Sequence, residues 1–268
     1  MAEILKVQNL SRHYTLNGST IRALDDVTLG LDEGRILGVV GESGSGKSTL
    51  AKQVMALDTP TSGEVLLDGR SLFALSPRQL RAARRNFQMV FQDPYSSLDP
   101  RHDVGRIIAE PLHLDPAAPK GAERRELVGE LLEDVGLSAS DVTRYPHEFS
   151  GGQRQRIAIA RALITKPRLL VADEATSALD LTVQKQILEL ILKLREEHGI
   201  SVLFITHNIG VVDEICDEVA VMQHGRLVET GPARAVLDAP REDYTRRLLA
   251  AEPTLEVIGR RSRRVAAR

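Results

Sequence analysis

The chain has 268 residues, of which 42% are hydrophobic and only 3% aromatic, and it contains no Trp. A chain of this length can form one large α/β domain or two small ones, with an aliphatic core. The formal net charge of −2 argues against wholesale binding of nucleic acid. The single cysteine, Cys216, excludes an intrachain disulfide and four-cysteine metal or iron–sulfur sites, and we expect it to be a small buried apolar side chain.

The N-terminus has no long apolar segment, and the apolar runs elsewhere are short. We therefore expect neither a signal peptide nor a membrane span. The expected protein is soluble and acts on the cytoplasmic side, and only another chain would hold it at a membrane.

The first 70 residues are predicted to form strands. Residues 3–40 read as short strands with a loop around Asn17-Gly18, and 63–67 form another strand that ends at the turn Asp68-Gly69. We expect these pieces to make an antiparallel sheet.

A phosphate-binding loop follows the strand predicted over 36–40. The sequence Gly-Glu-Ser-Gly-Ser-Gly-Lys-Ser-Thr fits the pattern Gly-x4-Gly-Lys-Ser/Thr. Leu50, Val54 and Leu57 follow it at the spacing of one helix face. Because strand, loop and helix are all present, a glycine-rich turn that binds nothing is the weaker interpretation.

Glycines let this loop bend around an anion, and the helix start turns its N–H groups toward phosphate. Lys47 would place its charge near the β- and γ-phosphates, and the Ser48 hydroxyl can ligate magnesium. The loop therefore predicts a nucleoside triphosphate site formed by Gly41, Glu42, Ser43, Gly44, Ser45, Gly46, Lys47, Ser48 and Thr49.

The middle of the chain is predicted to be a mainly helical insertion. A helix begins at Ser76-Pro77, and a short strand over Met89–Phe91 closes on Gln92. No strand-like run occurs from 95 to 149, where residues 104–112 and 122–135 have helical spacing.

Ser150 is expected to cap a helix that runs toward Ile164. The N-cap preference explains the serine, but it does not explain why two poor helix formers, Gly151 and Gly152, occupy the first turn. Exposed N–H groups at a helix start form a second candidate phosphate site.

Two later strands end on polar residues. The strand over 169–172 ends on Asp173-Glu174, and the strand over 201–205 ends on Thr206-His207, with a helix ending at His198-Gly199 between them. Alternation of strands and helices predicts a mostly parallel sheet with ligands at the carboxyl ends of its strands. Asp173 would hold a magnesium-bound water and Glu174 would polarise the attacking water, although such acidic pairs often only cap the next helix.

The end of the chain is predicted to hold a hairpin, 219–222 with 226–229, turning at His224-Gly225. Two short helices over 232–237 and 244–250 follow. Residues 251–268 are Arg-rich, and we expect a disordered basic tail there.

Taken with the phosphate loop, the signature Ser150-Gly151-Gly152-Gln153 resembles the ATP-binding cassette (ABC) ATPases of ABC transporters, and the resemblance covers residues 3–250. It implies an α/β fold of the P-loop NTPase type, RecA-like with a mostly parallel sheet. An antiparallel β subdomain and an inserted helical subdomain over about 93–163 would complete the domain.

The resemblance also implies roles for other residues. Tyr14 would stack on adenine, Gln92 would contact magnesium and sense the membrane subunit, and His207 would be the switch histidine at the γ-phosphate. The catalytic set would then be Glu174, His207 and Lys47, and the magnesium set would be Ser48, Gln92 and Asp173. The loop crossing to the opposite subunit would be Ser177, Ala178, Leu179 and Asp180.

Members of this family work as head-to-tail dimers. The implied partners are a second ABC ATPase, identical or related, whose ATP would contact this chain's Ser150–Gln153, and two integral membrane permeases. A solute-binding protein would act indirectly, and nucleic acid is not expected. The cofactors would be ATP and Mg²⁺, and the protein would lie at the cytoplasmic face of the inner membrane.

Residues 91–101, 145–149 and 244–246 are similar to the oligopeptide, dipeptide and nickel importer branch. This similarity implies uptake of peptides or a related small solute such as an opine or nickel. The chain departs from the branch at Asp99, where Asn is usual, and at Glu242-Asp243, where His-Pro is usual.

Two alternatives remain open. A soluble ABC ATPase acting in DNA repair would carry a long coiled coil between Gln92 and Ser150, and the translation type would carry two cassettes. A regulatory or inactive cassette is disfavoured because Lys47, Glu174 and His207 are all present.

Overall fold

The computed structural model describes residues 2–16 and 18–251, and it divides them into two compact units. The first unit holds the residues up to Ala74 and those from Ser201 onward, and the second is Leu75–Ile200. Within the described ranges no helix combines the length and the apolar character needed to cross a membrane. The basic tail was predicted over residues 251–268, and all of it except Ala251 lies outside the described residues.

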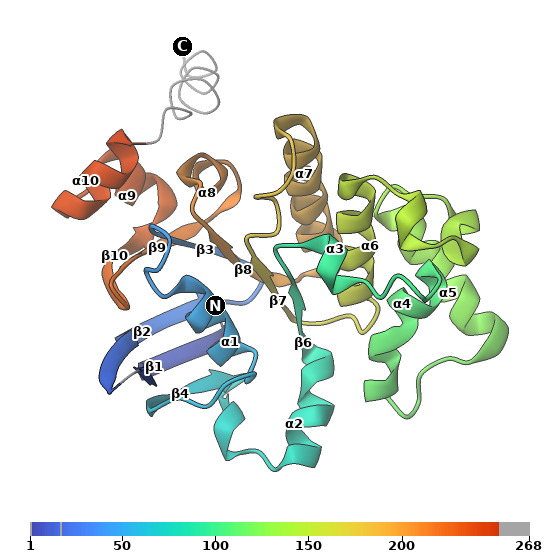
Figure 1. Cartoon of the computed structure of the whole chain (residues 1–268), viewed down its shortest axis with the longest axis horizontal. Helices are drawn as coiled ribbons and strands as arrows, with labels where there is room; N and C mark the ends of the chain where they lie inside the picture. Colours follow the sequence, from blue (N-terminus) through green and yellow to red (C-terminus); the bar gives the residue numbers. More distant parts are fainter. Residues whose placement is uncertain (1, 17, 252–268) are drawn as a thin grey trace. The chain divides into compact units, whose positions relative to one another are not determined.

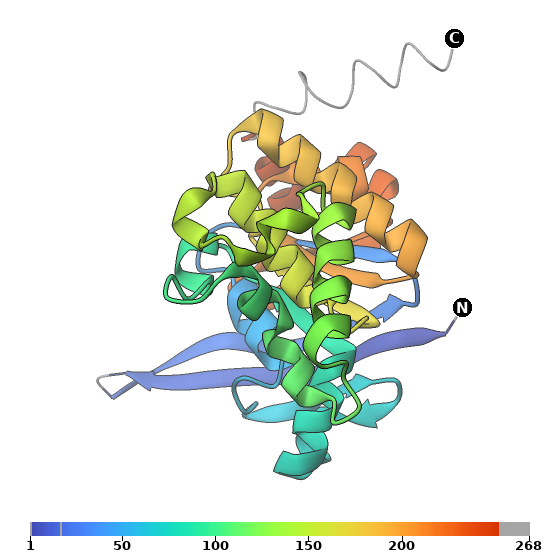
Figure 2. The same cartoon turned by 90° about the vertical axis from the view of Figure 1, so that its right-hand side faces the viewer.

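The first unit contains a four-stranded antiparallel sheet with the order β2-β1-β4-β5. Its strands are β1 (Glu3–Leu16), β2 (Ser19–Asp32), β4 (Ser62–Leu67) and β5 (Arg70–Ser71). The antiparallel sheet was predicted, but the prediction that residues 3–40 form only short strands was wrong. β1 and β2 have 14 residues each and form a long ribbon (Figure 2).

The ribbon of β1 and β2 continues past polar residues because the register of the two strands shifts where these residues lie. Asn9 and Asp26 have φ of 46° and 59°, and the Asn9 side chain donates to Asp26 Oδ1 at 2.9 Å across the ribbon. These two polar residues thus lie at irregularities in the register, where left-handed backbone is accommodated.

The other strands of the first unit lie in the order β10-β9-β3-β8. Their bounds are β3 (Ile36–Val40), β8 (Ser201–Thr206), β9 (Glu218–Gln223) and β10 (Arg226–Pro232). β3 pairs in parallel with β8 and β9, and every residue of β3 and β8 is buried, as expected for parallel strands covered on both faces. The predicted hairpin turn at His224-Gly225 is confirmed, with positive φ at both residues.

In the described part of this unit, five short helices accompany these strands: α1 (Lys47–Val54), η1 (Leu72–Ala74), α8 (Ile209–Ile215), α9 (Ala233–Asp238) and α10 (Asp243–Ala250). The prediction that Leu57 continues one face of this helix with Leu50 and Val54 was wrong, because α1 ends at Val54 and Leu57 is 54% exposed. α8 was not predicted, since seven residues are too few to display a helical period.

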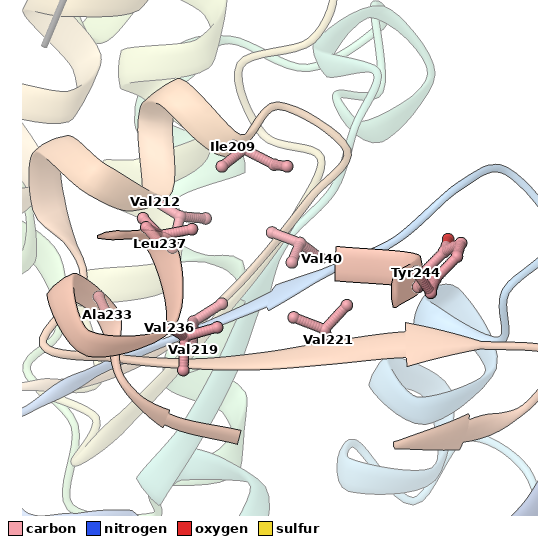
Figure 3. Packing of buried hydrophobic residues seen from close by; sticks show 9 residues of the cluster. All are labelled: Val40, Ile209, Val212, Val219, Val221, Ala233, Val236, Leu237 and Tyr244. Atoms are coloured by element: carbon pink, nitrogen blue, oxygen red, sulfur yellow. The ribbon is translucent and has the colours of Figure 1, made fainter. Parts of the chain in front are cut away.

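An apolar cluster packs around the end of β3 (Figure 3). It comprises Val40, Ile209, Val212, Val219, Val221, Ala233, Val236, Leu237 and Tyr244. Cys216 packs against this cluster but is half-buried rather than fully buried, and burial raises its thiol pKa. The cluster fixes Val40, the residue directly before the phosphate loop.

The second unit pairs β6 (Phe87–Val90) in parallel with β7 (Leu169–Asp173). The strand predicted over Met89–Phe91 begins two residues earlier and ends at Val90, leaving Phe91 42% exposed. The α-helices of this unit are α2 (Pro77–Ala83), α3 (Pro94–Ser97), α4 (Val104–Ala109), α5 (Gly121–Asp134), α6 (Gly151–Leu163) and α7 (Leu181–His198).

Four 3₁₀ helices complete it: η2 (Arg84–Asn86), η3 (Glu110–Leu114), η4 (Ala139–Thr143) and η5 (Pro146–Glu148). The predicted absence of strands from 95 to 149 is confirmed, and α4, α5 and α6 pack against one another (Figure 1). The predicted helix ends are also observed. Ser76 and Ser150 cap α2 and α6, and Gly199 closes α7 with φ of 65°.

Candidate functional site

The phosphate loop leaves the carboxyl end of β3 in a conformation that requires glycine. Gly41, Gly44 and Gly46 have φ of 155°, 80° and 109°. A Cβ on Gly41 would lie 2.2 Å from the Met222 carbonyl oxygen, and one on Gly46 would lie 2.5 Å from that of Ala23. Backbone oxygens cannot move aside, so both positions admit only glycine.

Lys47, at the start of α1, is held inside this loop. Its side chain is only 4% exposed, and Nζ donates to the Gly41 carbonyl at 2.7 Å and the Glu42 carbonyl at 2.9 Å. No side chain caps α1, and its first turn carries no acid. A buried ammonium beside an uncapped helix start is an environment that fits a phosphate.

His207 follows β8 beside the phosphate loop. The register of the two parallel strands pairs Val40 with Thr206, so Gly41 and His207 leave the sheet as neighbours. His207 is exposed, and Asn208 begins α8 by accepting from Val211 N at 3.2 Å. The structure thus brings the predicted histidine to the edge where the loop begins.

Tyr14 lies near the end of β1, and its ring is fixed by two neighbours. Its hydroxyl donates to Asp58 Oδ2 at 2.7 Å, and the Arg12 guanidinium lies 4.5 Å from the ring centroid. Neither Arg12 nor Asp58 was selected from the sequence.

Tyr244 is a second residue that sequence reasoning did not place at the site. The N–H of Glu42 donates to its hydroxyl at 3.2 Å, while the ring is buried in the cluster around Val40 (Figure 3). The similarity at 244–246 to one importer branch pointed to this tyrosine, but a bond to the phosphate loop could not be read from it.

In the second unit, Gln92 and the acidic pair Asp173-Glu174 follow neighbouring strands. Val90 of β6 pairs with Ala172 of β7, so Gln92 and Glu174 each stand two residues beyond paired positions. Glu174 adopts a left-handed conformation with φ of 48°, which is uncommon for a glutamate and is found at functional positions. Its carbonyl accepts from both Ser177 N and Ser177 Oγ.

The first turn of α6 carries the signature residues. Ser150 Oγ accepts from Gln153 N at 3.4 Å, and Gln153 Oε1 accepts from Ser150 N at 2.9 Å, which forms a capping box. As an acceptor in this bond, the Ser150 hydroxyl keeps its proton for donation to an anion.

The two signature glycines differ in their surroundings. A Cβ on Gly152 would lie 2.4 Å from Val183 Cγ1 of α7, which gives this glycine a packing reason. A Cβ on Gly151 would meet only Tyr95 Oη at 3.8 Å and Leu179 Cδ2 at 4.0 Å. Packing therefore does not explain Gly151.

α3, which follows Gln92, is attached to α6 by two arginines seven residues apart. The Arg154 guanidinium lies 4.1 Å from the Tyr95 ring centroid, and Arg161 donates to the Ser97 carbonyl. Asp93 caps α3, and hydrogen bonds from Tyr95 and Ser96 hold its pKa below the usual range.

The predicted dimer loop lies between β7 and α7. Ser177 and Ala178 are exposed, and Asp180 caps α7 by accepting from Val183 N at 3.0 Å. This cap fixes the end of the loop and leaves its centre at the surface.

Groups of three or more His, Cys, Asp or Glu side chains able to hold a metal do not occur among the described residues. The predicted magnesium ligands are instead a hydroxyl, an amide and a carboxylate: Ser48, Gln92 and Asp173. These are oxygen donors of the kind that Mg²⁺ prefers, and Mg²⁺ bound with a nucleotide takes its remaining ligands from phosphate and water. Each of these side chains therefore offers an oxygen that fits magnesium arriving with ATP.

The profile of the ABC transporter family matches residues 24–177, more than half of the chain. The chain therefore belongs to the ABC transporter family, and it is an ATPase cassette with the P-loop NTPase fold that the sequence predicted.

The relatives of this chain are named as ATP-binding proteins of transporters. It is 49% identical to "Probable peptide ABC transporter ATP-binding protein y4tS" of Sinorhizobium fredii, over 93% of this chain and 72% of that protein. It is 46% identical to the glutathione import ATP-binding protein GsiA of Escherichia coli, over 98% of this chain but only 43% of GsiA. This chain thus spans less than half of the length of GsiA.

Among solved structures, it resembles a dimer of the ATP-binding cassette MJ0796 in a post-hydrolysis state bound to ADP and Pi. The TM-score is 0.78 at 34% identity, covering 86% of this chain and 99% of that one.

Proposed function

We propose that this chain is the ATP-hydrolysing subunit of an importer that takes up peptides or a related small solute. The observation that carries the proposal is the 49% identity over 257 residues with a relative named as a peptide transporter ATP-binding protein. The relatives' names favour transport over a soluble ATPase of translation or repair.

The first unit would bind the triphosphate. Gly41–Thr49 would surround the phosphates with backbone N–H groups, and Lys47 would exchange its bonds to loop carbonyls for bonds to the β- and γ-phosphates. Tyr14 would stack on adenine. His207, beside the start of the loop, would contact the γ-phosphate.

The second unit would supply the groups for hydrolysis. Glu174 would accept a hydrogen bond from the attacking water, and Asp173 and Gln92 would each offer an oxygen ligand to magnesium. When bound, Mg²⁺ would neutralise negative charge on the phosphates. The left-handed backbone at Glu174 supports its role, because such strain persists where the surroundings hold a side chain in a required direction.

The signature would act on the nucleotide of a second ATPase subunit. Ser150 has a hydroxyl proton to donate, and Gly151 leaves the helix start uncovered. The exposed Ser177 and Ala178 would contact the same subunit, so ATP would close a head-to-tail dimer and hydrolysis would release it.

The helical part of the second unit would bind a permease, which would place the chain at the cytoplasmic face of the membrane. A cavity of about 760 Å³ lies among α4, η3 and the start of α5. Its lining includes the buried Ile107, Leu112 and Val128 and the exposed Arg106 and Arg125, together with the acidic Asp103, Glu110 and Asp115. Such a surface suits a short permease loop with apolar side chains and an acidic residue that pairs with Arg106 or Arg125.

The test is co-expression with candidate permease subunits of a peptide importer, followed by purification and reconstitution in vesicles. We expect the three proteins to co-purify and to drive ATP-dependent uptake of peptide. Arg125→Glu should abolish co-purification and leave the ATPase activity of the isolated chain unchanged, and Lys193→Glu on α7 is the matched control. Loss of binding in both variants, or in neither, would contradict the proposed docking surface.

A further inference from the structure

Arg12, Tyr14 and Asp58 form a closed group in which each side chain contacts the other two. Arg12 donates through Nε to Asp58 Oδ2 and through Nη2 to Oδ1, both at 2.8 Å. The Tyr14 hydroxyl donates to the same carboxylate at 2.7 Å, and the guanidinium covers one face of its ring. The bidentate geometry is the strongest form of this ion pair.

The backbone of this region explains why these three meet. Alternate residues of a strand share a face, so Arg12 and Tyr14 stand together on β1. The register of β1 against β2 shifts between Leu10 and Arg12 and again between Arg12 and His13, as at a bulge that redirects side chains. Asp58 belongs to the segment that follows α1, the helix that begins with Lys47.

That segment is fixed beside β1 by the backbone. Thr61 N donates to the Ser11 carbonyl at 2.8 Å, and His13 N donates to Thr61 Oγ1 at 2.9 Å. Side chains of Arg12 and Asp58 are about a quarter exposed, so water screens their pairing only in part. Burial opposes ionisation of Asp58, but hydrogen bonds from Tyr14 and Arg12 outweigh it and keep its pKa below the usual value.

We propose that Arg12 and Asp58 are positioning residues that hold the Tyr14 ring ready to stack on a purine base. This inference rests on the proposed function of Tyr14 as the adenine-stacking residue. Arg12 occupies one face of the ring, so the base stacks on the other face. Asp58 prevents the ring from turning. It also connects the ring to the segment that follows α1, the phosphate-binding helix, so the base and the phosphates are bound at a fixed distance and orientation.

The test measures binding of two probes, ATP and inorganic tripolyphosphate, to the full-length chain and its variants. Stacking of a base on an aromatic ring is worth roughly 1–3 kcal/mol, so Tyr14→Ala should weaken ATP binding by about five- to 150-fold. Tyr14→Phe and Asp58→Asn should weaken it by about three- to tenfold, the range of one lost hydrogen bond. Tripolyphosphate has no base, so its affinity should stay within about twofold throughout.

A double-mutant cycle identifies the route of the effect. In the Tyr14→Ala background Asp58→Asn should add nothing, because it acts through the ring. Asp25→Asn, which removes another arginine-paired carboxylate in the same unit, is the matched control and should not change either affinity.

The outcomes separate the two proposals. If Tyr14→Ala leaves ATP affinity unchanged, the proposed stacking role fails and this inference fails with it. If Tyr14→Ala weakens ATP but Asp58→Asn is silent or additive, only the positioning role is overturned. Equal weakening of ATP and tripolyphosphate by Asp58→Asn would show general damage to the fold and also overturn it. Arg12→Lys, which keeps the charge but loses the bidentate fork, gives a second variant should Asp58→Asn not fold.

Discussion

The two signature glycines predict opposite results for the same substitution. In Gly152→Ala, the new methyl group would lie 2.4 Å from Val183 Cγ1, more than 1 Å inside the usual separation of about 3.5–4.0 Å. Overpacking of this kind costs about 1–3 kcal/mol of unfolding free energy. In Gly151→Ala, the nearest atoms are at 3.8 and 4.0 Å, so stability should change by less than about 0.5 kcal/mol.

The assay is urea unfolding together with steady-state ATPase activity. Val183→Ala removes the opposing methyl groups, so the double variant Gly152→Ala/Val183→Ala should unfold within about 1 kcal/mol of Val183→Ala alone. Gly151→Ala should keep wild-type stability but lose ATPase activity, because its Cβ covers the helix start that we propose faces the partner's phosphate. A fully stable Gly152→Ala, or no relief in the double variant, would refute the packing argument.

Two further predictions follow from single side chains. Tyr244→Phe keeps the buried ring but removes the acceptor of the Glu42 N–H, so it should lower stability by about 1 kcal/mol and raise the KM for ATP; an unchanged KM and unchanged stability would count against a role in the phosphate loop. Cys216 is the single cysteine and burial raises its thiol pKa, so the thiol stays protonated at pH 8 and iodoacetamide should label it slowly in the folded protein and fully in urea, as measured by mass spectrometry. Rapid labelling of the folded protein would contradict this assignment.

Local signals in the sequence predicted much of the fold. The caps at Ser76 and Ser150, the closing Gly199 and the turn at His224-Gly225 all depend on residues within a few positions, and all are observed. The order of strands and helices likewise placed Gly41 and His207 at strand ends, where the register makes them neighbours.

Features that depend on distant partners could not be predicted in this way. The ribbon of β1 and β2 passes through Asn9 and Asp26, whose side chains hydrogen-bond across it, and no local pattern in the sequence indicates that bond. Tyr244 meets Glu42 across 202 residues, and Asp58 meets Tyr14 across 44. The hydrophobic periodicity of a sequence does not indicate contacts between distant residues. The residues that support the site were therefore identified only from the structure.

The central claim is that the phosphate loop is half of a site completed by a second ATPase subunit. Glu174→Gln should still bind ATP but hydrolyse it at least about a hundredfold more slowly, since a positioned general base contributes about 10²–10⁴-fold. Molar mass measured by light scattering after gel filtration tests the claim most directly. With ATP and Mg²⁺, this variant should move from 29.5 kDa to twice that mass, while Lys47→Ala should remain a monomer. A Glu174→Gln protein that is saturated with ATP and stays monomeric, both alone and when mixed with a related ABC ATPase, would contradict the account.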